Sequence, residues 1–177
     1  MADTDKHEPD KHEPDKHEPD RHQPGHVKFL VCIDESEDCR VALRFAALRA
    51  MRTGGQVALV YVMEPGELQQ WAAIGRLMED DQREVAERLL QQAAEEINEF
   101  AGVRPILIVR EGRKADEILS LIEEDPSINI MVLGAAPEGK GSNELVRQLT
   151  GELTRRLKIP LTIVPGNLTD AQLNQLT

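Results

Sequence analysis

The chain has 177 residues, which suffice for one ordinary domain but hardly for two. Acidic residues outnumber basic ones by 32 to 21, and the formal net charge of -11 argues against partners such as nucleic acid or an anionic membrane. No stretch approaches the roughly 20 apolar residues of a membrane span, and the first residues lack an apolar signal core. We therefore expect a cytoplasmic protein, and the presence of only two cysteines fits a reduced compartment.

Residues 1–26 differ in composition from everything that follows. The pentapeptide Lys-His-Glu-Pro-Asp occurs three times, starting at Lys6, Lys11 and Lys16. Proline in every fifth position forbids a helix and the repeats contain nothing apolar to bury, so this segment is expected to be a disordered arm. The arm holds all five histidines of the chain. Metal chelation by this arm is one interpretation, but a solvated arm is favoured because gathering ligands on a mobile chain costs entropy.

From Val27 onward, short apolar runs alternate with amphipathic stretches. The apolar runs predict strands at 27–33, 56–62, 104–109, 128–133 and 161–164. The amphipathic stretches predict helices at about 37–51, 79–101, 115–122 and 151–157, with Ser36 as the N-cap of the first. Thr169 is expected to cap a short terminal helix. Such alternation implies an α/β protein whose parallel sheet is doubly wound, with helices on both faces in a three-layer sandwich.

The stretch from Ile128 to Thr154 is the most informative part of this pattern. Its apolar run ends in Gly134, a polar loop contains Gly141, and Gly151 is predicted to begin a helix. A strand, a glycine-rich loop and a helix N-terminus can together hold an anion, because free backbone N–H groups and the helix dipole converge on one point. Glycine loops are also common as ordinary turns, so both interpretations remain open from these residues alone.

Other residues are expected at the same edge of the sheet. Ligands of open parallel sheets bind beyond the carboxyl ends of the strands, where Asp34, residues 62–64 and Gly112 are predicted to lie. Asp34 there has two interpretations. Its carboxylate either accepts hydrogen bonds from a sugar or stabilises the turn before the first helix.

Five segments carry a resemblance to a known family. They are residues 29–34 (Phe-Leu-Val-Cys-Ile-Asp), 57–62, 111–118, 131–134 and 160–165. In this order they resemble the universal stress protein family of UspA type. The resemblance implies a five-stranded parallel sheet over a domain at 27–166, an extension at 167–177 and a role in stress survival. It also implies a homodimer through the last strand and no classical catalytic site.

One branch of this family binds ATP through a loop written Gly-x2-Gly-x9-Gly-(Ser/Thr). Gly134 matches the first glycine, and Gly141 and Gly151 match the others if four extra residues are allowed. The resemblance further implies that Asp34 contacts the ribose and that Val62 meets adenine through its backbone. The nucleotide-binding residues implied in this way are Asp34, Val62, Gly134, Gly141, Gly151 and Thr154.

Glu152 departs from this pattern, because the ATP-binding branch has serine or threonine there. A carboxylate at a helix N-terminus is favourable by about 0.3–1 kcal/mol. Within about 4 Å of a triphosphate the same group is unfavourable by about 1 kcal/mol even in water-like surroundings. Glu152 is therefore predicted to weaken ATP binding unless Lys140, Arg147 or a magnesium ion compensates. The expected cofactor is ATP, another adenine nucleotide of lower charge, or none.

The residues leave two alternatives to a binding protein, an enzyme and a metal-buffering protein. Enzymes of the wider nucleotide-binding α/β group carry a His-x-Gly-His or a Ser-Gly-Gly-x-Asp-Ser loop after the first strand. This chain has Asp-Glu-Ser-Glu-Asp at 34–38 instead, which argues against such an enzyme. With no histidine after residue 26, Ser-His-Asp and Cys-His chemistry are excluded from the domain. Slow ATP hydrolysis and metal buffering by the histidine-rich arm remain as alternatives.

Overall fold

The computed structural model describes residues 27–34, 36–64, 72–136, 144–151 and 154–177, with the side chains of the long second helix described from Asp81 onward. The histidine-rich arm at 1–26, Gly141 and Glu152 lie outside these residues. The predictions about the arm's disorder, its metal binding and the repulsion from Glu152 therefore stay predictions.

Five parallel strands form a single sheet. They are β1 (Lys28–Cys32), β2 (Gln56–Met63), β3 (Ile106–Glu111), β4 (Ile128–Ala135) and β5 (Leu161–Pro165). They pair in the order β3-β2-β1-β4-β5, and every pair is parallel. The predicted α/β class and five-stranded parallel sheet are thus confirmed. The order reverses at β1, which has β2 on one side and β4 on the other.

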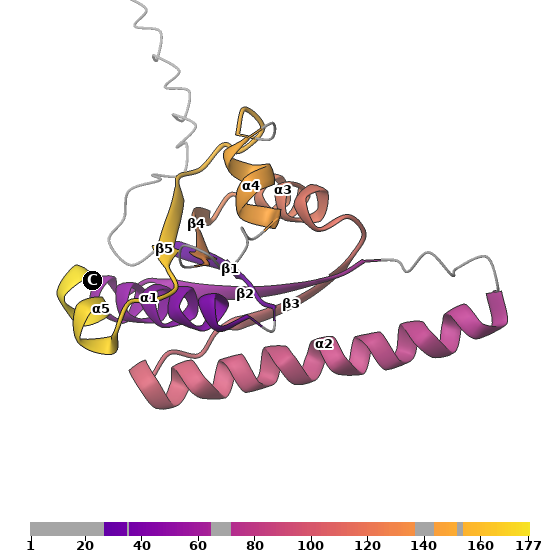
Figure 1. Cartoon of the computed structure of the whole chain (residues 1–177), viewed down its shortest axis with the longest axis horizontal. Coiled ribbons are helices and arrows are strands. Elements are labelled where there is room, and N and C mark those ends of the chain that lie inside the picture. Colours follow the sequence, from indigo (N-terminus) through magenta and orange to yellow (C-terminus); the bar gives the residue numbers. More distant parts are fainter. Residues whose placement is uncertain (1–26, 35, 65–71, 137–143, 152–153) are drawn as a thin grey trace, which may run out of the picture.

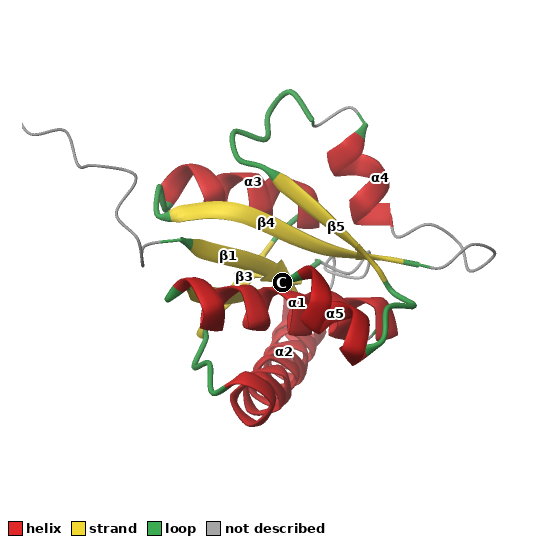
Figure 2. Cartoon of the chain, turned by 90° about the vertical axis from the view of Figure 1, so that its left-hand side faces the viewer, coloured by secondary structure: helices red, strands yellow, loops and turns green. Residues whose placement is uncertain are grey.

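The helices cover both faces of this sheet. They are α1 (Glu37–Thr53), α2 (Ala72–Ala101), α3 (Lys114–Glu124), α4 (Glu144–Thr150) and α5 (Asp170–Leu176). Figure 2 shows the strands as a middle layer, with α3 and α4 on one side and α1, α2 and α5 on the other. Alternate residues of β1 supply the two cores: Phe29 and Val31 pack with α1 and α2, while Leu30 and Cys32 pack with α3. This is the predicted three-layer sandwich (Figure 1).

Both ends of α1 agree with the sequence signals. The Ser36 hydroxyl oxygen accepts a hydrogen bond of 3.1 Å from the Cys39 N–H, which satisfies one of the free donors of the first turn. Gly54 follows the helix with a φ of 67°, a conformation that glycine adopts without a steric penalty.

The predicted helix at 151–157 is wrong. The helix in this part of the chain is α4, which ends at Thr150, and the described residues 151 and 154–156 form turns. Leu145 and Leu149 lie four residues apart and are both buried against the α3 side of the sheet, so the apolar face of the helix precedes Gly151. Gly151 ends the helix instead of beginning one, because glycine is among the poorest helix formers.

The short terminal helix predicted after Thr169 is present as α5. Thr169 and Gln172 form a reciprocal capping box at its start. Leu173 of α5 is fully buried in the α1–α2 core, and Asp170 forms a 2.8 Å ion pair with Arg44 of α1. Residues beyond 166 therefore contribute to the same core as the predicted domain.

Candidate functional site

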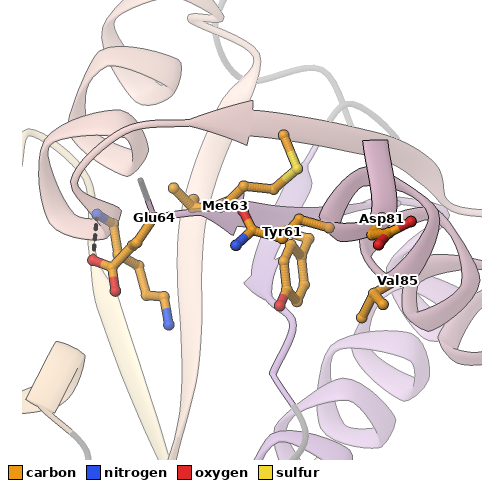
Figure 3. Close-up of a pocket in the computed structure, with 8 residues that line it drawn as sticks. Tyr61, Met63, Glu64, Asp81 and Val85 are labelled. Atoms are coloured by element: carbon orange, nitrogen blue, oxygen red, sulfur yellow. Dashed lines mark hydrogen bonds between the residues drawn. The ribbon is translucent and has the colours of Figure 1, made fainter. Parts of the chain in front are cut away.

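Two adjoining cavities open at the carboxyl end of β2. The first, here called the β2–α2 cavity, has a volume of about 400 Å³. It is lined by Tyr61, Val62, Met63, Glu64, Asp81, Gln82, Val85 and Lys114. In Figure 3, Tyr61 of β2 lies opposite Asp81 and Val85 of α2, while Glu64 lies beyond the strand end. A cavity of this size, with an aromatic wall and a few polar groups, is typical of a small-molecule site.

The second, here called the α3–α4 cavity, has a volume of about 520 Å³. It is lined by Glu64, Arg113, Lys114, Ala115, Asp116, Glu144, Arg147, Gln148, Gly151 and Arg156. Glu64 and Lys114 line both cavities, so the two spaces meet at these side chains. The sequence predicts Glu64 at this edge, but it did not single out Lys114, which lies beside it. The available signal was a basic pair, Arg113-Lys114, directly after the Gly112 turn at the start of a helix.

Val62 presents backbone polar groups toward the space beyond the end of β1. The C=O of Val60 accepts a hydrogen bond from the Ile33 N–H on the β1 side, whereas the C=O of Met63 accepts one from the Gly112 N–H on the β3 side. Because backbone groups alternate between the two sides of a strand, the N–H and C=O of Val62 face β1. The described pairing between β1 and β2 ends at the Cys32–Val60 pair. Val62 thus directs a backbone donor and acceptor past the last described β1–β2 pair.

Positive charge in the α3–α4 cavity is largely neutralised within the chain. Arg147 binds Glu144 through several hydrogen bonds, the shortest 2.6 Å, and these hydrogen bonds lower the pKa of the Glu144 carboxyl. Arg156 pairs with Asp116 at 2.9 Å. The Lys114 ammonium forms no ion pair with any group in the described part of the chain. Arg113 lies 3.7 Å from Asp116, and its side chain is 87% exposed. Lys114 and Arg113 are therefore the cations of this cavity without a close ion pair.

Asp34 lies apart from these two cavities. One carboxylate oxygen accepts hydrogen bonds from the Ser36 N–H at 2.9 Å and the Ser36 hydroxyl at 2.5 Å. This geometry matches the turn-stabilising interpretation of Asp34. The residue also lines a separate space between α1 and α2 with a volume of about 460 Å³. Contact with a ribose remains a prediction.

Gly134 has a packing reason to be glycine. A Cβ atom placed on it would lie 2.0 Å from the backbone oxygen of Asp38 in the first turn of α1. Only a residue without a side chain allows α1 to approach β4 so closely. Its role in holding phosphate remains a prediction, and the structure accounts for this glycine without a ligand.

Gly151 and Thr154 do not lie at a helix N-terminus, contrary to prediction. Gly151 lines the α3–α4 cavity, but its N–H donates to the Arg147 carbonyl at the C-terminal end of α4. The Thr154 hydroxyl donates to the Leu149 carbonyl at 2.8 Å. These contacts belong to the negative end of the helix dipole, which does not attract phosphate.

The thiols of Cys32 and Cys39 are both buried and unreactive near neutral pH. Burial is the largest cause of a raised pKa in both thiols, and the pKa is about 12 for Cys32 and about 12 for Cys39. Both groups are therefore neutral near pH 7 and do not act as nucleophiles there. Their side chains pack on opposite faces of the sheet, as small apolar residues.

No group of three or more metal-binding side chains lies together in the described part of the chain. Among the same residues, no helix combines the length and the apolar character that a bilayer span requires.

The fold and these cavities define a doubly wound α/β protein with ligand-sized spaces at the carboxyl edge of its sheet. Residues 27–165 match the model of the universal stress protein family. The chain belongs to this family, as the five sequence segments indicated. No curated protein sequence matches it significantly.

Solved structures agree with this assignment. UspA from Lactobacillus plantarum is 16% identical, with a TM-score of 0.66 over 78% of this chain and 97% of its own. A universal stress protein from Archaeoglobus fulgidus in complex with dAMP is 21% identical, with a TM-score of 0.55 over 77% of this chain and 96% of its own. A further universal stress protein, in complex with cAMP, is 15% identical, with a TM-score of 0.55 over 80% of this chain and 98% of its own. At these identities the similarity establishes the fold.

Proposed function

We propose that this universal stress protein is a non-catalytic, homodimeric binding protein for an adenine nucleotide and acts in stress survival. The observation that carries the nucleotide assignment is the meeting of the two cavities at the end of β2. There the Val62 backbone and the Lys114 ammonium, which has no ion-pair partner among the described residues, border one continuous space. Two structures of the same fold were solved with cAMP and dAMP, which supports a ligand of this class.

Each group has a natural counterpart on such a ligand. A backbone N–H and C=O side by side match the acceptor and donor on the edge of adenine. The Tyr61 ring supplies an apolar surface in the β2–α2 cavity. A phosphate then lies at Lys114, where a charge-assisted hydrogen bond contributes about 1.5–3 kcal/mol.

Replacing Lys114 by glutamine is expected to weaken AMP binding about tenfold, because the phosphate loses its cation. Isothermal titration calorimetry with AMP on the purified chain measures this change. Lys158→Gln is the matched control, since Lys158 pairs with Glu123 and lines neither cavity. An equal loss in both variants, or no AMP binding by the unsubstituted chain, would contradict the assignment.

The proposed dimer forms through β5, which lies at one edge of the sheet and leaves Ile163 40% exposed. An apolar edge strand must be covered or paired to avoid uncontrolled association. Ile163→Lys is expected to convert the dimer to a monomer in light scattering at micromolar concentration. The control is Ile106→Lys on the opposite edge, where Ile106 is 42% exposed. A monomeric unsubstituted chain, or dissociation by Ile106→Lys instead, would refute pairing through β5.

The side chains at the site favour binding over catalysis. The domain has no histidine, its two thiols are buried and neutral, and the cavity arginines are engaged with carboxylates. No base, nucleophile and orienting group therefore stand together among the described residues of the cavities.

A further inference from the structure

The carboxylate of Glu64 lies at the N-terminus of α3. One of its oxygens accepts a hydrogen bond of 3.1 Å from the Lys114 N–H, shown as the dashed line in Figure 3. Arg113, the N-cap residue of α3, makes no side-chain capping bond. A residue from the end of β2 thus fulfils the capping role that a serine or aspartate usually fulfils within the helix itself.

The strand ends bring this carboxylate to the entrance of the site. The Gly112 N–H donates to the Met63 carbonyl at 2.9 Å, which fixes the start of the α3 turn beside the end of β2. Gly112 has a φ of 145°, so the turn depends on a residue without a side chain. Glu64 is exposed and lines both cavities together with Lys114. A phosphate that approaches the Lys114 ammonium therefore also approaches a fixed negative charge.

The neighbouring charges do not cancel this effect. Glu144 and Asp116 are bound to Arg147 and Arg156, so these pairs add little net charge to the cavity. Arg113 lies 3.7 Å from Asp116 and its side chain is 87% exposed, so that carboxylate and the solvent weaken its effect on the cavity. What remains beside the N-terminus of α3 is the Lys114 ammonium and one carboxylate held by a backbone N–H. Repulsion from a single carboxylate increases with each negative charge on the ligand, whereas one ammonium is used fully by one phosphate.

We propose that Glu64 is a charge selector that restricts the site to adenine ligands with at most one phosphate group and discriminates against ATP. This inference rests on the proposed nucleotide site and concerns its specificity. Glu64 stabilises α3 in the empty protein and opposes each further phosphate when the site is filled.

The test is a titration of adenosine, AMP and metal-free ATP, in order of increasing negative charge, against the full chain and Glu64→Gln. Glutamine keeps the size of the side chain and an oxygen that accepts from the Lys114 N–H, so the substitution removes only the charge. Adenosine affinity is expected to stay within about twofold, AMP affinity to rise about threefold and ATP affinity to rise about tenfold. In about 0.5 M NaCl, the gain for ATP should shrink to less than about threefold, because salt screens exposed charges.

Glu99→Gln is the matched control, since Glu99 is exposed near the far end of α2 and lines neither cavity. It should leave all three affinities unchanged. An equal change for all three ligands with Glu64→Gln, or no gain for ATP, would overturn the selector while leaving the nucleotide site intact. Absence of adenosine and AMP binding to the unsubstituted chain would overturn both proposals.

Discussion

Replacing Gly134 by alanine should lower the free energy of unfolding by about 3 kcal/mol or more. The new Cβ atom would lie 2.0 Å from the Asp38 carbonyl oxygen and 2.4 Å from its carbonyl carbon. Both are backbone atoms of α1, so no side chain can rotate away, and either α1 or β4 must move. Overpacking of this kind costs about 1–3 kcal/mol and more where the backbone itself must shift. Urea denaturation followed by circular dichroism measures the change.

Gly102→Ala provides the comparison for Gly134. Gly102 has a φ of 67°, but nothing lies within 4 Å of a Cβ atom placed on it. Its replacement by alanine should lower the free energy of unfolding by only about 1 kcal/mol, because the left-handed backbone conformation is the sole source of strain. Similar losses for both variants would show that close approach to α1 is not what requires glycine at position 134.

Leu173→Ala is expected to destabilise the protein by about 3 kcal/mol. Leu173 belongs to α5, outside the residues that match the family, yet its side chain is fully buried against α1. Loss of a buried leucine removes its transfer free energy and leaves a cavity, which together cost about 2–5 kcal/mol. Thermal unfolding monitored by calorimetry measures the effect.

The matched control lies on the same helix. Leu176 is 59% exposed, so Leu176→Ala should change the stability by no more than about 0.5 kcal/mol. If Leu173→Ala were equally mild, α5 would be a loosely attached appendage, and residues 167–177 would be an extension in the energetic sense as well.

Much of the fold follows from local patterns in the chain. Apolar runs such as residues 29–33, most of which form β1, mark strands that are buried on both faces, and Ser36 and Gly54 mark the ends of α1 through their own capping chemistry. These signals act over a few residues, so they are readable without coordinates. The parallel sheet and its two layers of helices follow from the alternation of strands and helices.

Local patterns do not predict the position of α4, the last helix before β5. Glycine is strongly enriched just after helix C-termini and only modestly at N-caps, so the prediction of a helix start at Gly151 went against this preference. What decides is the burial of Leu145 and Leu149 against the α3 side of the sheet, which is a tertiary contact. The prediction placed the helix after Gly151, whereas the structure places it before.

Some features of the candidate site are likewise predictable from the sequence, and others depend on the tertiary structure. Residues at strand ends, such as Val62 and Glu64, were assigned to the edge of the sheet from the sequence, because every parallel strand ends at a common rim. Only the folded chain joins Glu64 to the Lys114 N–H fifty residues away and brings the Lys114 ammonium to the α3–α4 cavity. Distances between side chains on different elements depend on packing, and no local pattern encodes them.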